Sequence, residues 1–386
     1  MSETVKYRQL LIGVAFLGVY LLLDYVSFVK PYRDLGITPW NPPPGLSIAF
    51  VFLEGARVAP FAMIAPALAD ALIRGAPLGW GLEILSSVLI GGTYVLAGLW
   101  LQRIAAFDPR FRAVRDTLAL TGVGIVTSAV AAGLFVAILL SAGAVLRDEI
   151  MSVAWRAAVG DLIGILTIVP LVLLWRTYRP WPSIGPWTPV QLLAVLAALA
   201  IVFGYRDATA FQLFYLLFLP VLWVALSHGP PGAVVVLLLV QIGIVIGAEI
   251  RFGSDPGFGA LQVLMIALVI TGLIVATIVA EREDTAARMR DQQAALNRAL
   301  RIRSAGEIAA TIAHEMNQPL TALTTYTGIA IKAMNDGDPL MARNVLTKVQ
   351  AECGRATSVL TGIRELLRQG TLTRRPFNVK EAFNEL

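Results

Sequence analysis

The sequence predicts an all-α protein: a polytopic transmembrane helix bundle, then a charged helix, then a helical hairpin that pairs with a second copy into a four-helix bundle. Three observations predict it. The 386 residues are 57% hydrophobic and 15% charged, with a mean hydropathy of +0.71, whereas soluble chains are about 45–50% apolar and about 25% charged. Charged residues number 30 in positions 1–280 and 27 in positions 281–386. Long apolar runs fill the first part, and helical periodicity fills the second.

This composition excludes an ordinary soluble enzyme, a disordered protein and a nucleic-acid binder, although the net charge is +5. One cysteine cannot form an internal disulfide. The sequence shows no clustering of cysteine and histidine with metal-ligand spacing, so we expect no metal site. The apolar run from Leu10 to Phe28 is too long for a signal peptide, and we expect it to be a retained first helix.

The apolar runs predict eight to ten membrane crossings, because a crossing needs about 20 mostly apolar residues. The clear candidates are 8–29, 80–102, 114–145, 150–175, 188–205, 209–227, 230–250 and 258–280. The stretch 45–74 is ambiguous, since Glu54-Gly55-Ala56-Arg57 interrupts it. Residues 45–57 either dip into the membrane, which gives nine crossings, or form a short crossing, which gives ten.

The distribution of arginine predicts the orientation. Arg103, Arg110, Arg112 and Arg115 indicate a cytoplasmic loop, and Arg176 with Arg179 indicates another. The connections near Asp148, Asp207 and Asp255 are less basic and are expected outside. An even number of crossings, ten or eight, then places both termini in the cytoplasm.

Several ionisable residues lie inside the apolar runs: Asp24, Glu54, Arg57, Asp70, Glu83, Arg156 and Asp161. Such residues are costly in lipid and face a protein interior, a partner or a cavity. One hypothesis is a ligand pocket that involves Glu54, Arg57 and Asp161. The alternative is a set of structural ion pairs. Trp40-Asn41-Pro42-Pro43-Pro44-Gly45 is not expected to be helical, because consecutive prolines fix extended backbone. We expect a loop there, either a plain connection or the lip of that pocket.

These segments resemble the membrane-associated sensor (MASE, first type) domain over residues 10–280. The resemblance is carried by Trp40–Gly45, Glu54–Arg57 with Pro60, Gly160-Asp161-Leu162-Ile163-Gly164, and Phe218-Leu219-Pro220 through His228-Gly229. It implies an integral-membrane input module joined to a histidine kinase or a cyclic-dinucleotide enzyme, located in a bacterial inner membrane. It does not identify the signal ligand.

Residues 281–303 turn charged without a proline or glycine, which predicts that the last crossing continues as one helix. Met289, Gln293, Leu296, Leu300 and Arg303 follow the four-three spacing of a weak coiled-coil seam. We expect a signalling helix here, and a solvated linker helix is the alternative.

Residues 306–320 carry the chemical motif. With about 100° per residue, an apolar stripe forms on one face, and His314 lies opposite it. An exposed imidazole next to Glu315 fits a phosphoryl acceptor, because the carboxylate can take the proton from one ring nitrogen while the other attacks. A zinc-protease motif needs a histidine at 318, which is glutamine.

A second amphipathic helix is predicted after the turn at Asp336–Pro339, with its apolar positions Val345, Val349, Ala356, Val359, Ile363 and Leu366. Two such helices cannot bury their apolar faces alone, so a homodimer is expected.

His314-Glu315-Met316-Asn317-Gln318-Pro319-Leu320 resembles the H-box of the HisKA dimerisation and histidine-phosphotransfer domain, over residues 300–369. The resemblance implies that His314 accepts the phosphoryl group, that Glu315 is its acid/base partner, and that a response regulator receives the phosphate. Gln318 stands where the family often has a threonine or asparagine that orients water for dephosphorylation.

Arg375–Leu386 resembles the start of an ATP-binding domain, for which ATP and Mg²⁺ would be needed. We therefore expect domains at 1–280, 281–303, 304–369 and 370–386, in a sensor histidine kinase truncated before its ATP site. A membrane transporter with a regulatory tail is the rival interpretation, and a purely structural dimeric scaffold is a third.

Overall fold

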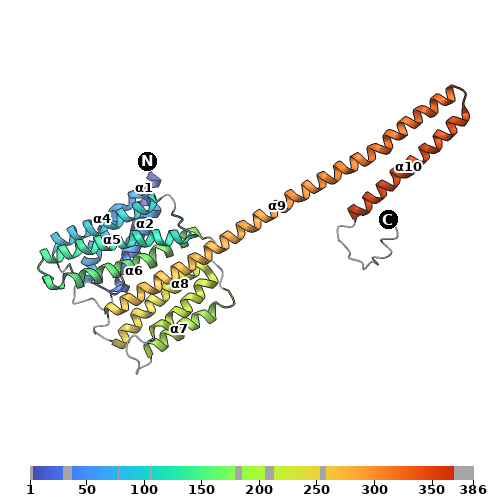
Figure 1. The fold of residues 1–386 in the computed structure, drawn as a ribbon. Helices are drawn as coiled ribbons and strands as arrows, with labels where there is room; N and C mark the ends of the chain where they lie inside the picture. Colours follow the sequence, from blue (N-terminus) through green and yellow to red (C-terminus); the bar gives the residue numbers. More distant parts are fainter. Residues whose placement is uncertain are drawn as a thin grey trace. The chain divides into compact units, whose positions relative to one another are not determined.

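The computed structural model describes residues 3–28, 37–76, 78–104, 107–178, 185–204, 213–252 and 258–368, and its elements are helices, which confirms the all-α expectation. Two compact units divide the chain at Ala287–Arg288 (Figure 1). The helices are α1 (Glu3–Ser27), α2 (Pro43–Glu54), α3 (Ala59–Ala69), α4 (Trp80–Arg103), α5 (Val114–Ser141), α6 (Ile150–Thr177), α7 (Thr188–Gly204), α8 (Phe218–Phe252), α9 (Phe258–Asn335) and α10 (Pro339–Arg368). Short turns η1 (Ala56–Val58) and η2 (Asp70–Arg74) flank α3, and η3 (Arg147–Glu149) and η4 (Phe214–Leu217) precede α6 and α8.

Seven helices in the described residues are long and apolar enough to cross a membrane, which identifies a multi-pass membrane protein. α2 and α7 are apolar but shorter. The expected pair of crossings at 209–227 and 230–250 forms one element, α8, together with η4. Seven helices meet the length needed for a crossing, which is fewer than the eight to ten predicted. The number is lower because α2 and α7 are too short to count and because the runs 209–227 and 230–250 count as one helix.

Contacts at the helix ends show which way the chain runs. At one end of the bundle, Gln102 near the end of α4 donates to the carbonyl oxygen of Phe52 near the end of α2, at 2.6 Å. The backbone N–H of Val114, the first residue of α5, donates to Glu281 of α9 at the same end. We call this the arginine end, because Arg103, Arg110, Arg112 and Arg115 follow α4 and begin α5.

The opposite end holds the end of α1 and η2, where Arg74 binds Asp24 at 2.9 Å. Gln262 of α9 reaches the carbonyl oxygen of Arg156 on α6 at this end, and Arg251 of α8 reaches that of Val202 on α7. The described helices of the first unit therefore alternate in direction between the two ends, and α2 and residues 218–228 are half-length passes. The crossing of the membrane by 45–57 stays a prediction.

Both half-length passes end at a glycine with the same unusual backbone. Gly55 has φ 78° and ψ −169°, and Gly229 has φ 59° and ψ −153°. This region of φ/ψ space is essentially restricted to glycine. At each glycine the chain changes direction: a short apolar helix ends, and the following helix returns through the bundle. The chain uses this backbone conformation for a reversal twice.

The prediction of a loop from Trp40 to Gly45 is wrong at its end: α2 begins at Pro43, because prolines are tolerated in the first turn of a helix. The segment before α2 lies at the middle of α6. The backbone N–H of Asn41 donates to the carbonyl oxygen of Gly160 at 3.1 Å. A Cβ at Gly164 would collide with the carbonyl oxygen of Asn41, and a Cβ at Gly160 would lie 2.9 Å from that of Thr38. Non-helical backbone inside a membrane bundle is tolerated where protein buries it or where it lines a cavity. These two glycines allow residues 37–42 that position.

In the second unit, α9 ends at Asn335 and α10 begins at Pro339, at the predicted turn. Gly337 has φ 78°, and Asp338 caps α10 by accepting the backbone N–H of Met341 at 3.0 Å. Ala342 and Val345 of α10 are buried, and Lys348 lies over the ring of Tyr326 at 5.8 Å. The hairpin thus forms along the predicted apolar face; the side chains of Ile363 and Leu366, like all of residues 369–386, lie outside the described part.

Candidate functional site

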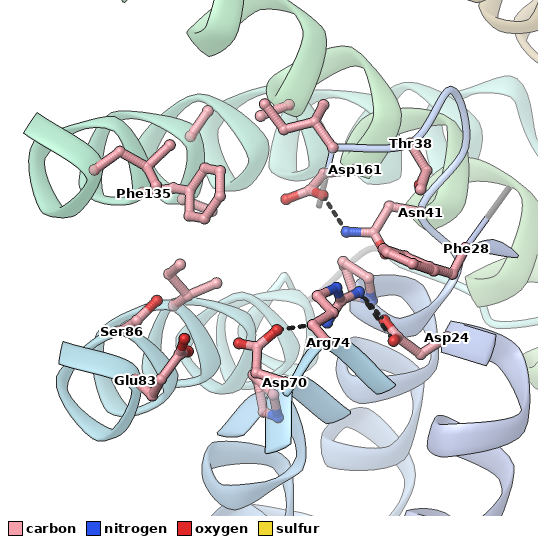
Figure 2. A pocket seen from close by; sticks show the side chains of 18 of the residues that line it. Asp24, Phe28, Thr38, Asn41, Asp70, Arg74, Glu83, Ser86, Phe135 and Asp161 are labelled. Atoms are coloured by element: carbon pink, nitrogen blue, oxygen red, sulfur yellow. Dashed lines mark hydrogen bonds and ion pairs between the residues drawn. The ribbon is translucent and has the colours of Figure 1, made fainter. Parts of the chain in front are cut away.

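A cavity of about 600 Å³ lies inside the first unit and extends from the end opposite the arginine end. Figure 2 shows side chains from α1, η2, α4, α5 and α6 and from the loop before α2 around one space. Its volume is typical of small-molecule sites, which measure roughly 300–1,000 Å³. We call it the acidic cavity, because its lining contains four carboxyl groups, those of Asp24, Asp70, Glu83 and Asp161, and one guanidinium group, that of Arg74.

Arg74 forms ion pairs with the two acidic side chains on one side of the cavity, Asp24 and Asp70. Its Nη2 lies 2.9 Å from both carboxylate oxygens of Asp24, and its Nη1 binds Asp70 one helical turn away. The guanidinium also lies over the Phe28 ring, 5.1 Å from its centroid. This cluster is the structural ion-pair arrangement that buried charges in a membrane require.

Asp161 lies on the other side of the cavity without a cation. Its Oδ1 accepts the amide of Asn41 at 2.7 Å, and its Oδ2 accepts the hydroxyl of Tyr94 at 2.6 Å. The side chain is 6% exposed, and no basic residue in the described part pairs with it. Two neutral donors stabilise a carboxylate less than a bidentate arginine does. Asp161 is therefore a buried acid that is hydrogen-bonded but not neutralised.

Glu83 also lines the cavity without a cation. It is 2% exposed, and its Oε1 accepts the backbone N–H of Leu78 at 3.0 Å, which closes the turn before α4. Figure 2 shows Glu83 and Ser86 on α4 facing Phe135 of α5 across the cavity. The lining thus joins carboxyl groups to an aromatic and aliphatic wall.

Only part of the pocket predicted from the sequence forms. Asp161 lines the acidic cavity, and Trp40 is buried beside it in the core. Glu54 and Arg57 are exposed next to the reversal at Gly55, toward the arginine end, and do not line the cavity. Sequence reasoning recognised Asp24, Asp70 and Glu83 as costly intramembrane charges but did not select them. Arg74 and Tyr94 were not selected because nothing in their local sequence marks them, and Asn41 was noted only as part of the segment Trp40–Gly45.

The second candidate site is the exposed face around His314 on α9. Both His314 and Glu315 are exposed, while Ile312 and Met316 on the opposite face are half-buried. Nε2 of His314 lies 3.4 Å from Nε2 of Gln318, so the amide stands one helical turn from the ring. Pro319 follows within the continuous helix. The imidazole is open to a reacting partner, as the sequence pattern predicts.

The start of the charged part of α9 is tied to the arginine end. Besides the bond from Val114, Arg112 lies 3.9 Å from Asp284, and Thr117 of α5 lies 3.4 Å from Thr277 of α9. α5 also supplies Phe135 to the acidic cavity. The helix α5 thus lines the cavity and also contacts Thr277 and Glu281 of α9, the helix that bears His314.

A multi-pass helical bundle with a buried polar cavity, joined through one helix to an exposed histidine motif, defines a membrane sensor. The sequence profile of the MASE1 family matches residues 9–283, and the chain belongs to this family. The match ends close to the division at Ala287.

Three curated relatives share a smaller part of the chain. The phosphoglycerate transport system sensor protein PgtB of Salmonella typhimurium is 35% identical over 94 residues, which is 24% of this chain and 14% of that protein. The C4-dicarboxylate transport sensor protein DctS of Rhodobacter capsulatus is 34% identical over 89 residues, 22% of this chain and 14% of that protein.

The sensor protein FixL of Bradyrhizobium diazoefficiens is 25% identical over 108 residues, 27% of this chain and 21% of that protein. The chain therefore spans about a fifth or less of the length of these relatives. No solved structure matches. Together, the family and the relatives identify a membrane sensor of two-component signalling.

Proposed function

We propose that this chain is the input and phosphoacceptor part of a sensor histidine kinase. The observation that carries the proposal is the exposed His314 with Glu315 and Gln318 beside it on α9, in a chain that belongs to a membrane sensor family and is similar to sensor proteins. In this assignment, a ring nitrogen of His314 attacks the γ-phosphorus of ATP, and the bond to ADP breaks. Glu315 takes the imidazole proton.

The phosphoryl group then passes from His314 to an aspartate of a response regulator, which restores the free imidazole. ATP with Mg²⁺ would be bound by a kinase domain. Gln318 lies within reach of the ring and would hold the water that hydrolyses the regulator's phosphate. His314 is open enough to meet both partners in turn, since its side chain is exposed and its face of α9 is polar.

Two copies of the chain would assemble through the hairpin. Apolar side chains of α9 and α10 remain exposed in one chain, among them Ile308, Leu320, Leu346 and Leu360. A soluble hairpin gains about 1.5–3 kcal/mol for each such side chain that a partner buries. A four-helix bundle made from two hairpins covers these positions, which supports a homodimer.

The membrane orientation follows from the arginine end. Basic loops favour the cytoplasmic side, which supports a cytoplasmic location for Glu3, the arginine end and residues 281–287 of α9. The acidic cavity then opens toward the outer face of the bacterial inner membrane. A ligand that shifts α5 would act on α9 through Val114–Glu281 and Arg112–Asp284.

Phosphorylation in trans tests the assignment. The full chain in lipid nanodiscs is mixed with γ-³²P-ATP, Mg²⁺ and a purified ATP-binding domain of a sensor kinase, and acid-labile, alkali-stable label is measured. We expect label on the unmodified chain and none on His314→Gln. The chain has two histidines, so His228→Gln is the matched control and keeps its label. Equal labelling of His314→Gln, or no label on the unmodified chain, contradicts the proposal.

A further inference from the structure

Two hydroxyl groups of the described lining face the space of the acidic cavity. Ser86 and Tyr20 are 5% and 4% exposed, and both line the cavity. Their hydroxyl oxygens are not among the sealed polar atoms of the described residues, so a molecule or water inside the cavity can reach them. A polar group of a bound molecule could therefore take its hydrogen bonds from this wall.

The charge of the lining indicates the sign of that molecule. Arg74 is the one basic residue in the described lining, and it is engaged by Asp24 and Asp70. Asp161 and Glu83 remain without a cation. An anion would add to this negative field in a medium of low dielectric constant, whereas a cation would neutralise it. The cavity therefore favours a positively charged occupant.

The shape and the walls separate an organic cation from a metal ion. In the described part of the chain, no three acidic, histidine or cysteine side chains lie close enough together to hold a metal. The wall instead carries Phe135, Phe28, Ile90 and Leu139 next to the acids. Aromatic faces attract ammonium groups, and the aliphatic side chains suit an apolar body. A volume of about 600 Å³ holds a small organic molecule with room for water.

We propose that the acidic cavity binds a protonated organic amine, whose ammonium group pairs with Asp161 and whose apolar body lies along Phe135. The proposal rests on the sensor function above and names its ligand class. The hydroxyls of Ser86 and Tyr20 accept or donate the remaining hydrogen bonds. Relatives named for phosphoglycerate and C4-dicarboxylate transport share too little of the chain to assign an anion here.

Calorimetric titration of the full chain in nanodiscs tests the ligand class. The probes are 2-phenylethylamine, its neutral analogue 2-phenylethanol, and the dianion succinate. We expect the amine to bind at least 10-fold more tightly than the alcohol, and succinate not to compete. Equal binding of amine and alcohol, preference for succinate, or no binding of the amine overturns the proposal.

Substitutions then locate the site. Asp161→Asn keeps the shape of the side chain and removes its charge, and we expect at least a 10-fold loss of amine affinity. Ser86→Ala removes one hydroxyl, and a loss of about 3-fold or more is expected. The control is Asp148→Asn in η3, an exposed acid outside the lining, which keeps full affinity. If Asp161→Asn loses its helical circular dichroism, it has not folded. The affinity of Ser86→Ala for the amine and the preference for amine over alcohol then test whether the cavity binds the amine.

The two proposals fail separately. His314 labelling in trans needs no amine, so label without amine binding refutes the ligand class alone. Amine binding that depends on Asp161, without label on His314, refutes the phosphoacceptor assignment alone.

Discussion

Tyr94 of α4 donates a 2.6 Å hydrogen bond to Oδ2 of Asp161 at the middle of α6. The carboxylate is thus held in place by a neutral hydroxyl and by the Asn41 amide, while the arginine in the same cavity serves other acids. This division leaves a buried carboxyl group without a basic partner among the described residues, next to the open space of the cavity.

The ion pair between Arg74 and Asp24 stabilises the membrane bundle. Arg74→Gln removes the cation from the buried Asp24 and the half-buried Asp70, and we expect it to lower the free energy of unfolding by about 3–5 kcal/mol. Unfolding in mixed detergent micelles, followed by circular dichroism, measures the change. The double variant with Asp24→Asn should recover part of the loss. Arg110→Gln, at an exposed loop position, is the control; equal stability of the two single variants contradicts the prediction.

Gly164 permits the close approach of residues 37–42 to α6. Gly164→Ala forces its Cβ against the carbonyl oxygen of Asn41, and the cost of overpacking is about 1–3 kcal/mol or more. A thermal unfolding curve of the nanodisc-embedded chain should shift to lower temperature. Gly122→Ala on α5, which meets nothing within 4 Å, should leave the midpoint unchanged or raise it. A neutral Gly164→Ala would show that the approach is not needed.

The reversals at Gly55 and Gly229 depend on backbone conformation and not on space. A Cβ would meet nothing within 4 Å at either position, yet both have positive φ. Gly55→Ala and Gly229→Ala should each destabilise the chain by about 1–3 kcal/mol. Gly133→Ala, in open space within α5, should stabilise it by up to about 1 kcal/mol. Chemical unfolding compares the three variants, and a stabilising effect at Gly229 would contradict the assignment of strain.

Leu320 tests the dimer proposed for the hairpin. It lies in the apolar stripe of α9 but is 49% exposed in one chain. Leu320→Asp should weaken the dimer at least 10-fold, since each protomer loses about 1.5–3 kcal/mol of burial. Sedimentation of the detergent-solubilised chain measures the monomer–dimer equilibrium. Thr321→Asp is the control for the added charge, because Thr321 is the next residue and is exposed. Equal weakening of the dimer by both substitutions would place the interface elsewhere.

The sequence by itself determined the features that depend on local periodicity and composition. Apolar runs indicated the membrane helices, and the change in charge at Glu281 lies close to the division between the two units at Ala287. The turn at Asp336–Pro339 follows from glycine and proline chemistry. The exposure of His314 follows from helical angles alone, because its neighbours on the chain are also its neighbours on the helix surface.

Only the tertiary structure decided which intramembrane charges meet. Asp24 and Arg74 are 50 residues apart in sequence, and Tyr94 and Asp161 are 67 apart, so no local pattern connects them. Glu54 and Arg57 looked equally costly in the sequence, but the reversal at Gly55 brings them to the other end of the bundle, where they are exposed. Helix periodicity reports which face is apolar; the depth of each residue and its partner across the bundle depend on where the chain turns back, and two glycine backbones set those turns.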